Sequence, residues 1–241
     1  MSFIIVVHVG EGIVLASDSR TTYTNTQILE DKTVVKHVGI HTTDTTDKTF
    51  ICPNGCGIST CGTSSINSKP ITGYIQSFIR ENISKETTVE SVPALLMEYF
   101  RQFNPIPDTN FIVAGYGYDE IEGEMVQRIY RVYIVREEIE TINTTAQGAS
   151  WDGETDVLSR IIQPVAYINP ATNQCEPLLH HEILWNFFTL QDAVDFAKYA
   201  VETTINTMHF QNRIETVGGE IDILVITPEK TSWLVKKEIS T

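Results

Sequence analysis

The sequence predicts an α+β fold: a four-layer αββα sandwich in which two antiparallel sheets pack face to face and a helix pair covers each outer side. Three observations favour it. Two apolar runs at the start of the chain are joined by Gly10-Glu11-Gly12, a pattern typical of an antiparallel hairpin. Strand-like and helix-like segments then follow in blocks, unlike the regular alternation of a parallel fold. No linker or change in composition divides residues 1–241, which we interpret as a single domain.

The first quarter of the chain is dominated by strand patterns. We expect strands at residues 3–9, 13–17, 33–40, 48–52 and 57–61. The third of these lies within a long polar loop rich in Thr and Asp. The last two flank Pro53-Asn54-Gly55, a strong turn signal.

Helical patterns begin after Gly62, where Thr63-Ser64-Ser65 can cap a helix whose apolar residues run from Ile66 to Ile79. A second helix is expected from Val89 to Phe103, because Asn104-Pro105 ends the pattern. Strands, two helices and a closing hairpin complete the order. We expect these later elements at residues 110–115, 125–135, 154–162, 190–208, 221–226 and 232–235.

Composition excludes several classes of function. The net charge is -14 and the pI about 4.8, which disfavours a nucleic-acid-binding surface or an anionic membrane partner. No apolar stretch approaches the roughly 20 residues that span a bilayer. The N-terminus lacks the basic region of a signal peptide, so we expect a cytoplasmic protein.

Neither the cysteines nor the histidines form a metal-site pattern. Cys52, Cys56, Cys61 and Cys175 lack a second ligand pair at the spacing of a zinc site, and we expect small buried residues in a reducing compartment. His180-His181 are adjacent, which separates their side chains. Nucleotide-binding glycine motifs are absent from the sequence. We therefore expect no metal and no cofactor.

Ser2 is the residue that points to chemistry. A small residue after the initiator Met1 normally permits removal of that methionine, which makes serine the first residue. A terminal serine carries a hydroxyl nucleophile and an α-amino group that can act as its base. The strand that follows Ser2 returns antiparallel and ends at Asp18, so we expect Asp18 to lie beside Ser2. There its carboxylate can hold a lysine that tunes the amine.

At this point the chain resembles a known family. GIVLASDSRTT is similar to the corresponding segment of proteasome β subunits and of HslV, N-terminal nucleophile (Ntn) hydrolases that begin with a threonine. DKTFICPNGCGISTCGTSS resembles the family segment in which a catalytic lysine opens one strand and a glycine closes the next. FIVAGYG and TVGGEIDILVIT are similar to later family strands, so the resemblance extends in order over most of the chain.

The resemblance implies four central roles. Ser2 would be the nucleophile, Lys48 the residue that lowers the pKa of its amine or hydroxyl, and Asp18 the partner of the lysine. Gly62 would offer its backbone N–H to the oxyanion. Lys32 and Lys36 are rivals to Lys48, because the segment after Asp18 is longer than in the family; the spacing of Lys48 from Gly62 favours Lys48.

Further positions are carried over in the same way. The resemblance implies that Thr22 and Ser64 bind substrate backbone. It places a late catalytic serine at Ser150 and a late acid at Glu215, each out of register with the family pattern.

Three functions follow for the same chain. The first is a proteasome-like hydrolase that cleaves peptide or amide bonds through Ser2. The second is a noncatalytic proteasome-like assembly or binding subunit, and the third a small-molecule amidase of the same superfamily. The resemblance also implies a homo-oligomeric ring and an ATPase unfoldase as a partner.

Overall fold

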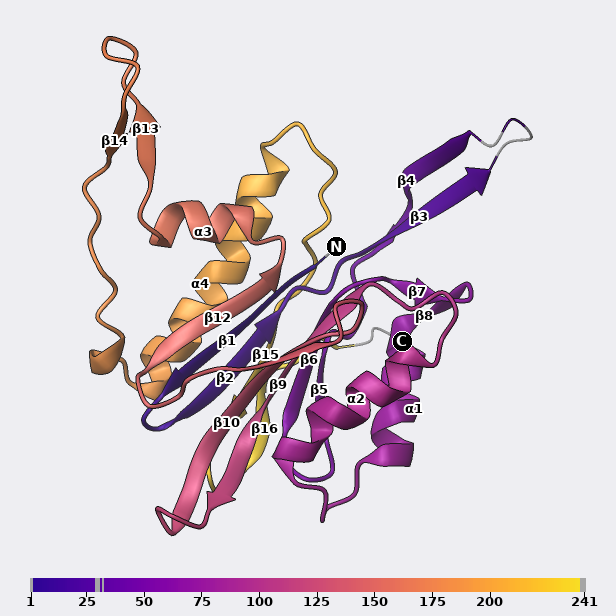
Figure 1. Cartoon of the computed structure of the whole chain (residues 1–241), viewed down its shortest axis with the longest axis vertical. Coiled ribbons are helices and arrows are strands. Elements are labelled where there is room, and N and C mark those ends of the chain that lie inside the picture. Colours follow the sequence, from indigo (N-terminus) through magenta and orange to yellow (C-terminus); the bar gives the residue numbers. More distant parts are fainter. Residues whose placement is uncertain (1, 29–30, 32, 239–241) are drawn as a thin grey trace.

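The computed structural model describes residues 2–28, 31 and 33–238 (Figure 1). Met1 and Lys32 lie outside the described residues, so the structure does not bear on the removal of Met1 or on the rivalry of Lys32.

One five-stranded antiparallel sheet contains the N-terminus. Its order is β12-β1-β2-β15-β16, with bounds Gly148–Gly153, Phe3–Val9, Gly12–Ser17, Asp222–Ile226 and Thr231–Val235. The predicted hairpin of β1 and β2 is confirmed. Every residue of both strands is buried, because they are central in the sheet and covered on both faces.

A second five-stranded antiparallel sheet holds the middle of the chain. Its order is β11-β10-β9-β6-β5, with bounds Glu138–Thr141, Glu124–Tyr133, Thr109–Asp119, Gly57–Gly62 and Thr49–Ile51. The predicted turn at Pro53-Asn54-Gly55 joins β5 to β6. It is closed by hydrogen bonds between Cys52 and Cys56 (N to O, 2.9 Å) and from Gly55 N to Cys52 O (2.9 Å).

Three two-stranded sheets lie apart from the two large ones. They are β3–β4 (Thr21–Ile28, Val34–Thr43), β7–β8 (Ser65–Ile66, Lys69–Pro70) and β13–β14 (Ala166–Ile168, Cys175–Pro177). Figure 1 shows β3–β4 and β13–β14 projecting from the body as separate arms. The sequence predicted a long loop with one strand before Lys48. This prediction is wrong, because the segment forms a hairpin of two strands, β3 and β4.

Four α-helices occur in the described residues: α1 (Ile71–Asn82), α2 (Val92–Arg101), α3 (Asp156–Ile162) and α4 (Leu190–His209). Short 3-10 turns at Val89–Ser91 and Trp185–Phe187 precede α2 and α4. A capping box between Thr189 and Asp192 fixes the start of α4. The predicted start of α1 is wrong, because Asn67 and Ser68 adopt left-handed conformations and turn the chain into the β7–β8 hairpin.

The apolar residues form three clusters. One joins α1 and α2 to the second sheet through Phe78, Phe100 and Phe111. Another joins α4 to the first sheet, with Ala197 and Val201 against β1. The third contains residues of both large sheets, among them Ile4, Leu15, Ile112, Ile129 and Leu224. The start of β1, where Ser2 lies, is therefore enclosed by packed elements.

The expected four-layer αββα sandwich of Ntn-hydrolase type is wrong. Strand residues in the described part of the chain are divided among five antiparallel sheets, three of them two-stranded, and its α-helices range from seven to 20 residues. The Thr-rich stretch and the stretch after α3 form two projecting arms (Figure 1).

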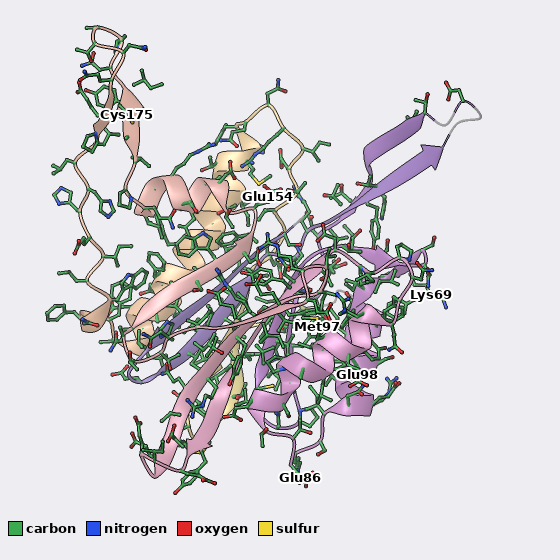
Figure 2. All side chains as sticks on the ribbon, in the orientation of Figure 1. Lys69, Glu86, Met97, Glu98, Glu154 and Cys175 are labelled. Atoms are coloured by element: carbon green, nitrogen blue, oxygen red, sulfur yellow. The ribbon has the colours of Figure 1, made fainter. Side chains whose placement is uncertain are left out.

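The structure bears on two expectations from composition, the burial of the cysteines and the lack of a membrane-spanning segment. Cys52, Cys56 and Cys61 are buried as predicted, whereas Cys175 is exposed on the β13–β14 arm (Figure 2). Across the part of the chain that the structure describes, the helices lack the combination of length and apolar character needed to cross a bilayer.

Candidate active site

Ser2 is held from two sides by backbone hydrogen bonds. Its carbonyl oxygen accepts from the backbone N–H of Glu154 (2.8 Å), just beyond β12 (Figure 2). The next backbone N–H, that of Phe3, donates to Oδ1 of Asp18 (3.0 Å). The residue is buried. The start of β1 is thus fixed between β2 and β12.

Gly153 makes this fixation possible. It pairs with Phe3 and has a φ of +93°, a conformation that side chains rarely allow. A Cβ at this position would lie 1.8 Å from the carbonyl oxygen of Ser2. Only glycine therefore permits this approach of β12 to Ser2.

Asp18 is a fully buried carboxylate with four donors around it. Oδ1 accepts from Phe3 N (3.0 Å) and from the ammonium of Lys48 (2.7 Å). Oδ2 accepts from the backbone N–H of Arg20 (3.1 Å) and of Gly218 (3.0 Å). Because a buried charge is tolerated only when it is paired and hydrogen-bonded, this set explains why an aspartate can end the strand here.

Lys48 lies just before β5 and is almost fully buried. Besides Asp18, its ammonium donates to the carbonyl oxygen of Arg20, and its own carbonyl accepts from Thr60 N (2.8 Å). Burial lowers the pKa of Lys48, and the Asp18 carboxylate opposes that effect. The predicted partnership of Asp18 and Lys48 is present in the structure. The backbone of Lys36, the other rival, lies in the β3–β4 arm opposite Thr26.

Ser2, Lys48 and Gly62 line one small pocket with a cavity volume of about 20 Å³. Gly62 has a φ of +106°, and a Cβ there would lie 2.4 Å from the carbonyl oxygen of Asp108. Among the described residues, Ser2 Oγ has no hydrogen-bond partner, so its hydroxyl is not engaged by them. The other lining residues are Thr21, Thr46, Asp47, Thr60, Cys61, Thr63, Ser64 and Ile71.

A second set of ion pairs lies on the outer side of Asp18. The guanidinium of Arg20 donates to both oxygens of Asp44 (2.7 and 2.8 Å) and to Glu215 (3.0 Å). Glu215 also lies 3.1 Å from Nδ1 of His209. A Cβ on Gly218 would lie 2.5 Å from the centre of the Arg20 guanidinium. Gly218 therefore lets the loop before β15 reach both Asp18 and Arg20.

The structure does not bring all the predicted site residues together. Ser150 pairs with Val6, three residues before Gly153 in β12, and does not line the pocket. Glu215 is connected to the pocket only through Arg20. Ser64 lines the pocket, and Thr22, next to the lining residue Thr21, is buried with its hydroxyl unpaired.

Sequence reasoning assigned no role in the site to three residues that shape it, although Gly153 and Glu154 lie in a stretch that could rim a pocket or form a turn and helix start. Gly153 and Glu154 hold the carbonyl of Ser2, and Gly218 donates to Asp18. The Gly218-Gly219 pair is a visible signal, although by itself it indicates only the end of a helical region. In the described residues, no group of three or more His, Cys, Asp or Glu side chains is arranged to hold a metal ion.

Comparisons with known proteins identify the fold. No family model matches the sequence, and no curated protein matches it. Solved structures do match. The Gly-1 mutant of Anbu from Hyphomicrobium sp. strain MC1 has a TM-score of 0.59 and 13% identity, with 100% of this chain and 87% of that chain covered. Anbu from the same organism has a TM-score of 0.56 and 12% identity, with 98% and 88% covered.

A third structure is Anbu, described as an ancestral beta-subunit, from Yersinia bercovieri, with a TM-score of 0.56, 15% identity, and 98% and 88% covered. At these identities the likeness shows the fold alone. It also corrects the assignment to proteasome β subunits and HslV, because these three similar structures belong to the distinct Anbu group. The chain therefore has the fold of these three Anbu structures.

Proposed function

We propose that this chain is an amide hydrolase that uses Ser2 as an N-terminal nucleophile after removal of Met1, and that its substrates are peptides. One observation carries the proposal. Oδ1 of Asp18 accepts both from the N–H of Phe3 and from the ammonium of Lys48, which fixes the residue after Ser2 and the lysine on one atom. A nucleophile and a cation are thereby held in the same pocket.

The reaction would proceed through an ester. The α-amino group of Ser2 accepts the hydroxyl proton as Oγ bonds to the substrate carbonyl carbon. The positive charge of Lys48 lowers the pKa of that amine, which keeps it neutral and able to accept a proton. The C–N bond then breaks, and the leaving amine takes the proton. Water then attacks the ester carbonyl carbon and gives a proton to the α-amine; the bond from that carbon to Oγ breaks, the acid is released, and Oγ takes the proton back from the amine.

Gly62 is proposed as an oxyanion donor through its backbone N–H. Its left-handed φ and its place on the pocket wall support the role. We assign substrate binding to Thr22 and Ser64. The start of β3, which contains Thr22, and the loop after β6, which contains Ser64, border the pocket, and both could pair with an extended peptide.

A second candidate is a noncatalytic assembly or binding subunit with the same fold. It is favoured by the positions of Ser150 and Glu215, which leave the pocket without the late serine and acid that the sequence suggested. For either candidate we propose a cytoplasmic homo-oligomer, with an ATPase unfoldase as a partner of the hydrolase.

Covalent labelling separates the two candidates. Protein with an intact-mass-verified N-terminus is incubated with a serine-reactive peptide electrophile, and the adduct is located by peptide mapping. We expect one adduct on Ser2, none in Ser2→Ala, and at least about tenfold slower labelling in Lys48→Met. Exposed Ser84→Ala and Lys85→Met are the matched controls and should label normally.

Labelling that persists in Ser2→Ala would refute the hydrolase. The same protein is then offered peptides and small amides in parallel, because cleavage of small amides alone would favour an amidase. Absence of both labelling and cleavage, with Met1 removed, would favour the noncatalytic subunit.

A further inference from the structure

A second buried ion cluster lies behind Lys48, at the end of the C-terminal strand. Its centre is Asp222, the fully buried first residue of β15. Oδ1 of Asp222 accepts from the backbone N–H of Lys237 (2.8 Å). Oδ2 accepts from the ammonium of Lys237 and from that of Lys236 (3.2 Å). Two residues just after β16 are therefore tied to the start of β15.

Asp47 closes the cluster on the side of the pocket. Its Oδ1 lies 2.9 Å from the ammonium of Lys237 and 2.5 Å from that of Lys236. The Lys237 side chain is only 6% exposed, whereas that of Lys236 is 31% exposed. Lys237 is thus the inner ammonium of the cluster, between two carboxylates.

The cluster is attached to both halves of the proposed site. Asp47 directly precedes Lys48 and lines the same pocket. Asp222 of β15 pairs with Ser17 of β2, and Ser17 directly precedes Asp18. A displacement of Lys237 would therefore act on the two backbone segments that carry the Asp18–Lys48 pair.

We propose that Lys237 is a positioning residue for Lys48: clamped by Asp222, it fixes Asp47 and places a second positive charge behind the lysine of the pocket. The catalytic part of this inference rests on the proposed function of Ser2. The arrangement of charges does not.

The charges that face the two lysines decide the sign of the effect. Lys48 faces Asp18 just after β2, Asp44 in the loop before β5, Cys61 of β6, and Lys237. Lys237 faces Asp222, Asp47, Lys236 and Lys48. Burial disfavours the charged form of Lys237, but hydrogen bonds to Asp222 and Asp47 outweigh it and raise its pKa. Lys237 therefore stays positive, and its charge adds to the effect of burial in lowering the pKa of Lys48.

The test is a direct titration of Lys48 in the whole chain. The protein is labelled with ¹³C at the lysine ε carbon, the Lys48 signal is assigned with Lys48→Met, and its chemical shift is followed against pH. In Lys237→Gln, which keeps a donor for Asp222 but removes the charge, we expect the Lys48 midpoint to rise by about 0.5 to 1 pH unit. Lys237→Arg should restore it.

Two further variants complete the test. Lys198→Met removes an exposed lysine of α4 paired with Glu202 and should leave the midpoint unchanged. Should Lys237→Gln fail to fold, Lys237→Met replaces it. That variant also removes the charge of Lys237, so the Lys48 midpoint should rise as in Lys237→Gln.

A Lys237 that only anchors the C-terminal strand would alter stability without moving the Lys48 midpoint, and an unchanged midpoint overturns the proposal. The failures of the two proposals are distinguishable. Unlabelled wild-type Ser2 would end the hydrolase proposal, yet the Lys48 titration would still decide the role of Lys237. Where Ser2 does react, the pH profile of its labelling should move with the Lys48 midpoint.

Discussion

Two groups of ion pairs meet at Asp18-Ser19-Arg20, and they differ in exposure. On the inner side, the side chains of Asp18 and Lys48 are 0% and 3% exposed. On the outer side, those of Arg20, Asp44 and Glu215 are 20%, 44% and 40% exposed. Three consecutive residues thus serve both the enclosed pocket and the surface.

This difference in exposure indicates which group of ion pairs contributes more to the stability of the fold. The loss of one partner of a buried pair leaves a charge without compensation, while surface pairs contribute little because water screens them. The inner pair also orders backbone, since three backbone N–H groups converge on Asp18. We therefore expect changes on the inner side to be costly and matched changes on the outer side to be mild.

Asp18→Asn should have the largest effect. All four neighbours of the carboxylate are donors, so an amide NH₂ would face donors and leave Lys48 unpaired. We expect a loss of about 3 to 5 kcal/mol in the free energy of unfolding, measured by urea denaturation. Asp44→Asn is the outer control and should lose less than about 1 kcal/mol. Equal losses would remove the distinction between the two sides.

Two glycines provide the next comparison. An added Cβ at Gly153 meets the backbone oxygen of Ser2, which cannot move without the strand, and Gly153 also has a positive φ. At Gly218 the added Cβ meets the Arg20 guanidinium, the end of a flexible side chain. We expect Gly153→Ala to lose about 2 to 4 kcal/mol in urea denaturation, and Gly218→Ala clearly less. A larger loss for Gly218→Ala than for Gly153→Ala would contradict the conclusion that backbone contacts dominate on the inner side.

The outer side should show its own pH dependence. The hydrogen bond from Arg20 lowers the pKa of Asp44 below its ordinary value of 3.8, against a smaller opposing effect of burial. The stability from this pair is therefore full above that value and is lost as pH falls through the lowered pKa. We expect Arg20→Gln to lose about 1 kcal/mol at neutral pH and to converge with the wild type once the pH has fallen below the lowered pKa of Asp44. Curves that stay parallel over this range would be inconsistent with the pairing.

Glu215→Gln should have the smallest effect. The side chain touches Arg20 and His209 but not the pocket, so we expect a change below about 0.5 kcal/mol in stability and an unaltered rate of Ser2 labelling. A strong loss of labelling would restore Glu215 to the catalytic residues that the sequence suggested.

The sequence predicted the inner side better than the outer one, for a physical reason. Uninterrupted apolar residues and a glycine turn determine the β1–β2 hairpin locally, and its antiparallel register then brings Asp18 to Ser2. Lys48 and Gly62 were carried over from the family resemblance, and a strong local turn places them on one hairpin, Lys48 just before β5 and Gly62 at the end of β6.

Ser150, Gly153 and Glu215 show where local patterns fail. Which residue of β12 meets Ser2 depends on a register between strands more than 140 positions apart, and that register is set by the left-handed Gly153. Glu215 lies in the loop between α4 and β15, and its contact with Arg20 depends on the path of that loop. The left-handed pair Asn67 and Ser68, which converts the predicted start of α1 into a hairpin, likewise has no periodic signal.

The most direct test of Ser2 as an N-terminal nucleophile is the intact mass of the protein before and after reaction with a serine-reactive peptide electrophile. The protein should be produced in a cell with normal methionine processing, and N-terminal sequencing should accompany the measurement. The account predicts a mass without Met1, a sequence that begins at Ser2, and a single adduct on that residue. Retention of Met1, or an adduct elsewhere in the chain, would contradict it.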